Sequence, residues 1–512
     1  MQTNVLEYFE NGSLIKCPMK IAVSDQKQSV TYERLAYSAK RIAVSIIRQS
    51  RSFRVPIAVY LPKCVEVIIA DLGILYSGNI YMNLDVKSPL QRIYNIIENI
   101  KPTILLTSKE YQKNIDQLGL KSIEIFLIDD LLNEPIRMDD DIIRARMEQI
   151  IDTDPLCIIN TSGSTGIPKG VVLNHRGTID FMDWCFARLD LKSDERIGSL
   201  SPFFFDIYTL ELIYCLAKGS ELIIIPDNLA IYPAKMVEYL SIKNISFIFW
   251  VPSIMVNISN RNLLGKSDLS RLKTIFFAGE VFPMKHLNQW RRALPETKFV
   301  NLYGPIEITV DCTYFIVDRE FADNEQLPIG FPCHNTDVMI LNEKDKPCNE
   351  AEKGELCVRG SSLAMGYWND SEKTKKGFVQ NPINKNYPEL IYRTGDIVYY
   401  NDRGEIMFVG RKDFQIKHLG YRIELPEIEQ QVLCIEGIAN ACVVYNDIKK
   451  EIALFYEASN ELINPAFIRQ RLSEIFPKYM LPTGFYKLKE LPRNPNGKID
   501  RNGIARKLKE EV

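Results

Sequence analysis

The stretch from Asn160 to Gly170 has the composition of a loop that binds phosphate. It contains three glycines, several hydroxyl side chains and Lys169, and it directly follows the apolar run Leu156–Ile159. A strand that ends in such a loop offers unhindered backbone N–H groups, hydroxyl donors and one mobile cation, which together suit polyphosphate. A polar turn between two strands has a similar composition. The stretch is not the loop of the P-loop NTPases, because a proline precedes Lys169 and a glycine follows it.

Four later stretches offer groups that a bound nucleotide needs. Asn301–Glu307 ends in a carboxylate that can bind Mg²⁺ beside phosphates, and Tyr392–Asp396 ends in an acid that can accept hydrogen bonds from ribose hydroxyls. A charged stretch, 410–424, comes next, and Asn494–Asp500 presents Lys498 in a tight turn. Each stretch alone is most simply a turn or a solvated charge. Their order along the chain predicts one nucleotide site.

The composition of the 512-residue chain is that of an ordinary globular protein. It is 46% hydrophobic and 25% charged with a formal net charge of −2, which gives no basic surplus for nucleic acid. No apolar run approaches the roughly 20 residues that cross a bilayer, so no membrane association is expected. The eleven cysteines form no Cys-x-x-Cys pair, the N-terminus lacks an export signal, and the four histidines are scattered. We therefore expect a cytoplasmic protein with reduced thiols and no His-rich metal site.

Alternating apolar runs and amphipathic segments must position these groups. Short apolar runs alternate with helix-like segments through the first half of the chain, which predicts mostly parallel sheets covered by helices. The predicted strands are 55–60, 80–84, 104–106, 221–225, 247–250 and 274–277, and the predicted helices are 65–75, 90–100 and 235–240. From about Val338 the pattern changes to short alternating strands, at 354–358, 397–400 and 405–409, which predicts a smaller β-rich subdomain.

The last hundred residues carry a separate pattern. Helices are expected at 425–433 and 465–475, with strands at 439–445 and 452–456 between them. This mixture predicts a small α+β domain with its boundary near Asp413. The alternative is that the tail extends the main core.

Together the motifs resemble those of the amino-acid adenylation domains in the adenylate-forming superfamily, which also contains acyl-CoA synthetases and luciferases. The resemblance runs from Val30 to Lys498. It implies an α/β fold with a large N-terminal core, 1–412, whose β-rich subdomain spans about 338–412. It also implies a mobile α+β lid, 413–512, that swings about a hinge at Asp413.

The same resemblance implies roles for individual residues, with ATP and Mg²⁺ as cofactors. Lys498 bridges the substrate carboxylate and the α-phosphate, and Glu307 binds Mg²⁺. The implied ATP-binding residues are Thr161, Ser162, Gly163, Ser164, Thr165, Gly166, Lys169, Gly279, Glu280, Asn301, Tyr303, Gly304, Asp396 and Arg411. One position departs from the family, because Ile306 replaces a threonine whose hydroxyl contacts the α-phosphate. A water or a neighbour such as Thr309 is the expected substitute.

Asp206, in the apolar stretch Phe203–Glu211, determines the expected substrate class. A helix-capping aspartate is one interpretation, because aspartate commonly caps helices. In the family, this position pairs with the α-amino group of an amino acid, which acyl-CoA synthetases have no need to bind. The side-chain pocket is implied to consist of Ile207, Leu210, Ser253, Phe276, Ala278, Leu302, Val310 and Asp311. This mainly apolar set is similar to that of prolyl-adenylating enzymes, although Asp311 suits serine, and D-alanine–carrier protein ligases have the same organisation.

The resulting prediction is a ligase that activates a small amino acid, with L-proline favoured, and loads it onto a carrier protein. The chain ends about fourteen residues after Lys498, so the carrier is expected to be a separate protein. An acyl- or aryl-CoA synthetase is the alternative from another class. A nucleotide-binding regulator with a degenerate site is a third alternative, favoured only by Ile306.

Overall fold

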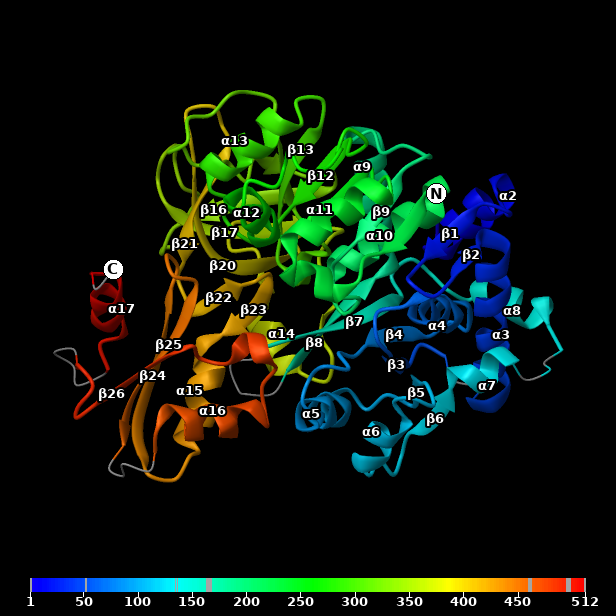
Figure 1. Cartoon of the computed structure of the whole chain (residues 1–512), viewed down its shortest axis with the longest axis horizontal. Helices are drawn as coiled ribbons and strands as arrows, with labels where there is room; N and C mark the ends of the chain where they lie inside the picture. The colour runs from blue at the N-terminus through cyan, green and yellow to red at the C-terminus, as the bar shows by residue number, and fades with distance from the viewer. Residues whose placement is uncertain are drawn as a thin grey trace. The chain divides into compact units, whose positions relative to one another are not determined.

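The computed structural model describes residues 2–50, 53–133, 135, 137–162, 168–458, 463–493 and 499–510 (Figure 1). These residues form two compact units. The first contains 1–85, 101–159 and 170–412, and the second contains 86–100, 160–169 and 413–512.

The first unit contains a nine-stranded sheet with the strand order β15-β14-β13-β12-β11-β9-β10-β1-β2. Its central strands β9 (Arg196–Ser199), β11 (Phe247–Trp250), β12 (Thr274–Phe277) and β13 (Lys298–Tyr303) are parallel neighbours. The remaining strands are β1 (Ile21–Ser24), β2 (Ser29–Thr31), β10 (Glu221–Ile224), β14 (Thr313–Ile316) and β15 (Phe331–Pro332). The apolar runs of β11 and β12 are buried along their whole length, as expected for parallel strands covered on both faces.

A seven-stranded sheet, most of whose residues belong to the first unit, has the order β18-β8-β7-β4-β3-β5-β6. Its strands are β3 (Pro56–Tyr60), β4 (Ile80–Asn83), β5 (Ile104–Thr107), β6 (Glu124–Leu127), β7 (Pro155–Thr161), β8 (Lys169–Asn174) and β18 (Gly366–Tyr367). Helices α3 (Tyr32–Ser50) and α4 (Val65–Tyr76) pack closely against each other. Gly73 permits this approach, because a Cβ there would lie 2.8 Å from the carbonyl oxygen of Ala39. Further helices of this unit are α9 (His175–Arg188), α10 (Asp206–Lys218), α11 (Pro233–Ile242), α12 (Pro252–Asn260) and α13 (Met284–Ala293).

The β-rich part of the first unit is a five-stranded antiparallel sheet. Its strands are β16 (Thr336–Leu341), β17 (Gly354–Gly360), β19 (Phe378–Gln380), β20 (Leu390–Tyr400) and β21 (Ile406–Arg411). Strand β20 is longer than predicted, because it contains the Tyr392–Asp396 motif that the sequence placed before a strand. Asp396 lies opposite Arg411 in the pairing of β20 with β21.

The second unit contains α5 (Leu90–Ile100) and the α+β elements of residues 413–512. These are β22 (Gln415–His418), β23 (Tyr421–Glu424), α15 (Leu425–Leu433), β24 (Ile438–Asn446), β25 (Glu451–Ala458), α16 (Pro465–Ser473), β26 (Gly484–Leu488) and α17 (Arg501–Glu510). Ile428 of α15 and Ile468 of α16 are buried in one apolar cluster with the inner face of β24 and β25. Helix α15 has the predicted bounds.

The predicted α/β class, with a large sheet core, a β-rich subdomain and an α+β segment, is therefore confirmed. Helices and strands occupy the predicted ranges with shifts of one or a few residues, apart from β20, which begins at Leu390 rather than at the predicted residue 397. Within the described ranges, no helix is both long enough and apolar enough to cross a membrane.

Candidate active site

Four loops of the first unit leave the carboxyl ends of adjacent parallel strands. Asp206 follows β9, Ser253 follows β11, Glu280 follows β12 and Glu307 follows β13, in the spatial order β13-β12-β11-β9. Parallel strands bring their carboxyl ends to one edge of a sheet, and open α/β sheets bind ligands there. The topology thus gathers residues that lie a hundred positions apart in the sequence.

Tyr303, Asp396 and Arg411 form a connected group at the end of β13. The Tyr303 hydroxyl donates to Asp396 Oδ2, and Arg411 Nη1 lies 2.8 Å from Asp396 Oδ1. The side chain of Asp396 is only 8% exposed. Burial, with the Asp396 charge adding to it, raises the pKa of Tyr303 well above its ordinary value, so the phenol remains a donor. Asp396 therefore connects three predicted nucleotide residues, and it and Arg411 come from a different sheet than Tyr303.

Asn301 lies two residues before Tyr303 in the same strand. Strand β13 includes both residues. Successive side chains of a strand alternate between faces, so Asn301 and Tyr303 share one face. Asn301 Nδ2 donates to the carbonyl of Pro328 at 2.7 Å, which fixes the orientation of the amide.

Glu307 is completely buried in the short 3₁₀ helix Ile306–Ile308. The hydroxyl of Tyr367 donates to Glu307 Oε1 at 2.8 Å, and the Glu307 carbonyl accepts from Ala364 N at 2.9 Å. Strand β18, which carries Tyr367, is held by pairing with Val171 and Val172 of β8. Glu307 is thus oriented from a segment sixty residues away. The sequence prediction included Glu307 but missed Tyr367, which no local motif marks.

The turn after Glu307 has an unusual backbone. Thr309 and Val310 have φ angles of 49° and 63°, and both are β-branched residues that rarely adopt such values. The Thr309 side chain is fully buried, and its hydroxyl donates to the carbonyl of Ser362 at 2.8 Å. The Thr309 hydroxyl already donates to this carbonyl, and its expected replacement of the hydroxyl missing at Ile306 stays a prediction. Residues in such strained conformations cluster at functional sites.

Gly304 permits this turn to fold back against β13. A Cβ at Gly304 would lie 2.5 Å from Cα of Asp311 and 2.9 Å from the carbonyl oxygen of Val310. No side chain fits there without a backbone shift. The glycine thus brings the end of β13 directly against two predicted pocket residues.

Asp206 begins helix α10, and the residue that caps this helix is Phe205, which makes no side-chain capping hydrogen bond. The interpretation of Asp206 as the helix cap is therefore wrong. Asp206 is half-buried and occupies the first turn. The partial positive charge of a helix N-terminus favours a carboxylate there. The position suits a side chain that receives a cationic group of a ligand.

The predicted pocket residues come from α10, α12, β12 and the residue after it, β13, and the strained turn with the residue that follows it. Most of them are buried: Leu210 and Phe276 are fully covered, and Leu302, Val310, Asp311 and Ala278 are nearly so. The ring of Phe276 makes edge contacts with Phe247 and Phe249, which fix its orientation. Ile207 and Ser253 are half-buried. The predicted pocket lining is therefore mainly apolar, and it includes one nearly buried carboxylate, that of Asp311.

Ser253 and Glu280 connect two of the four loops. The backbone N–H of Ser253 donates to Glu280 Oε2 at 2.9 Å. The Ser253 hydroxyl is buried without a hydrogen-bond partner among the described residues. Gly279, immediately before Glu280, has a φ of 92°, which a side chain would disfavour. The predicted adenine-side residues are therefore tied to the substrate-side loop.

The remaining predicted residues belong to the second unit. Thr161 and Ser162 are buried, and Lys169 is half-buried at the start of β8. Asp413 is exposed between β21 and β22, and its Oδ1 accepts from Gln415 N at 3.3 Å. Gly163, Ser164, Thr165, Gly166 and Lys498 lie outside the described residues.

The carboxylate of Glu307 fits a role in binding Mg²⁺ together with nucleotide phosphates. Mg²⁺ prefers oxygen ligands and is commonly held by one or two carboxylates plus substrate phosphates. Across the described ranges, no group of three or more His, Cys, Asp or Glu residues could hold a metal on its own.

Comparison with known proteins agrees with this geometry. Residues 14–368 match the family described as AMP-binding enzyme. The chain belongs to this family.

This AMP-binding enzyme is similar to peptide synthases in sequence and to solved adenylation domains in fold. It is 30% identical to gramicidin S synthase 1 of Brevibacillus brevis over 96% of its length, but it spans only 43% of that protein. The Vibrio cholerae adenylation domain AlmE, solved with glycyl-adenosine-5′-phosphate, has the same fold, with a TM-score of 0.85 at 20% identity over 100% of this chain and 98% of AlmE. PA1221, an NRPS protein with adenylation and PCP domains, gives a TM-score of 0.83 at 22% identity over 99% of this chain and 84% of its own. The predicted resemblance to adenylation domains is confirmed.

Proposed function

We propose that this AMP-binding enzyme couples a small amino acid to AMP and then transfers the aminoacyl group to the phosphopantetheine thiol of a carrier protein. The observation that carries the proposal is the row of four loops at one sheet edge. Asp206, a carboxylate suited to an ammonium group, follows a strand at the same edge as the nucleotide residues Tyr303 and Glu307. Similarity to amino-acid adenylation domains supports the same assignment.

The first half-reaction needs alignment and charge neutralisation more than a protein nucleophile. A carboxylate oxygen of the amino acid attacks the α-phosphorus of ATP, and pyrophosphate leaves with the electrons of the broken P–O bond. Asp396 and Tyr303 would hold the ribose and the base, with Arg411 keeping the Asp396 charge compensated. Mg²⁺ at Glu307 supplies positive charge to the phosphates when it is bound. By resemblance, Lys498 supplies the second cation.

The second half-reaction is thioester formation. The thiol of a carrier arm attacks the carbonyl carbon of the mixed anhydride, and AMP leaves with the bridging oxygen. The presence of PCP domains, which are carrier proteins, in PA1221 supports such a partner. Delivery of the carrier as a separate protein is part of the proposal, as is rotation of the C-terminal segment about Asp413 between the two steps.

L-Proline is the first candidate substrate, because the predicted pocket residues are mainly apolar. Phe276, Leu302 and Val310 are nearly or fully buried, and the bulk of Phe276 and Leu302 favours a short substrate side chain. Serine is a second candidate, because Asp311 is nearly buried among the predicted pocket residues and a carboxylate can accept a hydrogen bond from a substrate hydroxyl. D-Alanine is the competitor with a smaller side chain.

Exchange of labelled pyrophosphate into ATP tests the proposal. The panel contains L-proline, L-serine, L-alanine, D-alanine and glycine, plus acetate and benzoate as acids without an amine. We expect exchange with one of the amino acids and loss of this exchange in Asp206→Ala. Exchange with an acid that lacks an amine, unaffected by Asp206→Ala, would instead identify an acyl- or aryl-CoA synthetase.

A further inference from the structure

A buried polar cluster lies behind the first turn of α10. It consists of Asp71 on α4, Asn83 at the end of β4 and Tyr208 on α10, together with the backbone of Phe203. Asp71 and Tyr208 are fully buried, and Asn83 is 7% exposed. Burying polar side chains costs free energy unless they form hydrogen bonds. In return, a hydrogen-bonded cluster fixes the orientation of its members, which apolar packing does not.

The hydrogen bonds of the cluster converge on one carboxylate oxygen. The Tyr208 hydroxyl donates to Asp71 Oδ2 at 2.8 Å, and Asn83 Nδ2 donates to the same oxygen at 2.9 Å. Asn83 Nδ2 also donates to the carbonyl of Phe203 at 3.1 Å. Asp71 therefore fixes a side chain two residues after Asp206 and, through Asn83, a carbonyl three residues before it.

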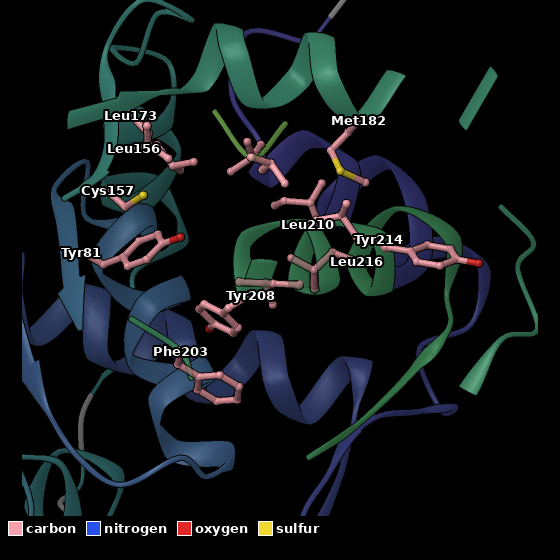
Figure 2. Close-up of a cluster of buried hydrophobic side chains, with 14 of the residues drawn as sticks. Tyr81, Leu156, Cys157, Leu173, Met182, Phe203, Tyr208, Leu210, Tyr214 and Leu216 are labelled. Carbon is pink, nitrogen blue, oxygen red and sulfur yellow. The ribbon is translucent and has the colours of Figure 1, made fainter. Parts of the chain in front are cut away.

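Ring packing strengthens the same connection. The rings of Phe203 and Tyr208 are stacked, with centroids 4.2 Å apart and planes inclined by 23°. Figure 2 shows these two rings side by side. The hydroxyl of Tyr81, which Figure 2 also labels, lies 3.3 Å from the Thr209 hydroxyl on the next residue of α10. The loop before Asp206 and the turn after it are thus clamped from both α4 and β4.

An acid is a poor choice for this place on stability grounds alone. The second oxygen of Asp71 and the amide oxygen of Asn83 are buried and have no hydrogen-bond partner among the described residues. Burial raises the pKa of Asp71 to about 7, although the hydrogen bonds from Asn83 and Tyr208 lower it. An apolar residue would avoid this cost. What the acid adds is two directed hydrogen bonds that an apolar residue cannot make.

We propose that Asp71 is a positioning residue for the amino-acid substrate: through Tyr208 and Asn83 it fixes the first turn of α10 and hence the direction of the Asp206 carboxylate. The proposal rests on the proposed function of Asp206. It predicts a defect specific to the amino acid, because Tyr303, Glu307 and Asp396, which are assigned to the nucleotide, take part in none of the hydrogen bonds described for the cluster.

Asp71→Leu and Asp71→Asn are compared with the unmodified enzyme in pyrophosphate exchange, with the amino acid that the enzyme activates best. For Asp71→Leu we expect the KM for the amino acid to rise about tenfold or more, with the KM for ATP unchanged within about twofold, because small displacements of a binding group are costly. Asp71→Asn keeps an acceptor oxygen for both donors, so it should restore the KM to within about threefold. If Asp71→Leu does not fold, Tyr208→Phe keeps the stacked ring, removes one hydrogen bond and should give the same selective rise.

Asn83→Leu and Asn288→Leu form a matched pair that separates positioning from stability. Asn288 is also a buried amide whose Nδ2 donates to a carbonyl and a carboxylate, those of Phe321 at 2.9 Å and Asp323 at 2.8 Å, but on α13. Both variants should lower the melting temperature. Only Asn83→Leu should raise the KM for the amino acid.

The possible results separate the two proposals. Unmodified enzyme that exchanges with no amino acid overturns the proposed function and the role of Asp71 together. Active enzyme whose Asp71→Leu variant loses only melting temperature, or shows equal changes in both KM values, overturns the positioning role and leaves the proposed function standing.

Discussion

Tyr367→Phe removes a single hydroxyl from the candidate active site and keeps the ring. The ring packs edge-on against Phe378 with centroids 6.0 Å apart, and this contact survives the change. What is lost is the 2.8 Å hydrogen bond to Glu307, a carboxylate with no exposed surface. A hydrogen bond to a charged group contributes about 1.5–3 kcal/mol.

That free energy sets the expected size of the effect. Each 1.4 kcal/mol corresponds to a factor of ten, so a loss of about 1.5–3 kcal/mol predicts a roughly 10- to 150-fold fall in kcat/KM for Mg·ATP. The reason is that Glu307 would no longer be oriented toward the metal-bound phosphates. Pyrophosphate exchange measured over a range of Mg·ATP concentrations, at saturating amino acid, gives this ratio.

Tyr76→Phe is the matched control. Tyr76 is a fully buried tyrosine at the end of α4 whose hydroxyl donates to the carboxylate of Glu10 at 2.5 Å, outside the candidate active site. Both variants should have a lower melting temperature than the unmodified enzyme, but only Tyr367→Phe should have a lower kcat/KM for Mg·ATP. Equal kinetic effects in the two variants, or none in Tyr367→Phe, would refute the role assigned to Glu307.

Three further predictions follow from other contacts. Arg411→Met removes the 2.8 Å ion pair to Asp396, so we expect the KM for ATP to rise about tenfold or more while the KM for the amino acid changes little, as exchange kinetics would show; a larger effect on the amino acid would contradict the assignment of Asp396 to the ribose. Gly304→Ala forces a Cβ to within 2.5 Å of Asp311 Cα, so exchange should fall about a hundredfold with every substrate, and retention of full activity would show that the turn is not fixed by this contact. Burial raises the pKa of Glu211 to about 8 in the folded state, above its unfolded value, so its contribution to stability is present at low pH and is lost as pH rises through about 8. The melting temperature of Glu211→Gln relative to the unmodified enzyme should therefore increase between pH 5 and pH 9, and a difference independent of pH would contradict the buried, protonated carboxyl.

Local patterns were enough to predict most of the fold. The apolar run Phe247–Trp250 and the amphipathic segment 425–433 each contain the information that determines their structure, so their bounds were predicted closely. Glu307 and Asp396 could be singled out from the sequence, because each lies in a motif of contiguous residues, and their roles stay predictions.

Features that depend on tertiary contacts could not be predicted in this way. Tyr367 orients Glu307 across sixty residues, and nothing in its own neighbourhood in the sequence indicates this. Asp71 looks like an interruption in an apolar helix until α4, β4 and α10 are packed together, when it becomes the acceptor for Tyr208 and Asn83. Aspartate often caps a helix, which favours that interpretation of Asp206 in the sequence, whereas the backbone geometry gives the cap position to Phe205.

The central claim, that a carboxyl oxygen of an amino acid becomes bonded to the phosphorus of AMP, can be measured with heavy oxygen. The enzyme is incubated with ATP, a phosphopantetheinylated carrier protein and an amino acid whose carboxylate is labelled with heavy oxygen. The mass of the released AMP is then measured by mass spectrometry. Attack by the carboxylate predicts that AMP retains one labelled oxygen when the thiol displaces it, and that the carrier gains one aminoacyl group. Unlabelled AMP, or loading of the carrier without AMP formation, would contradict adenylation as the reaction of this chain.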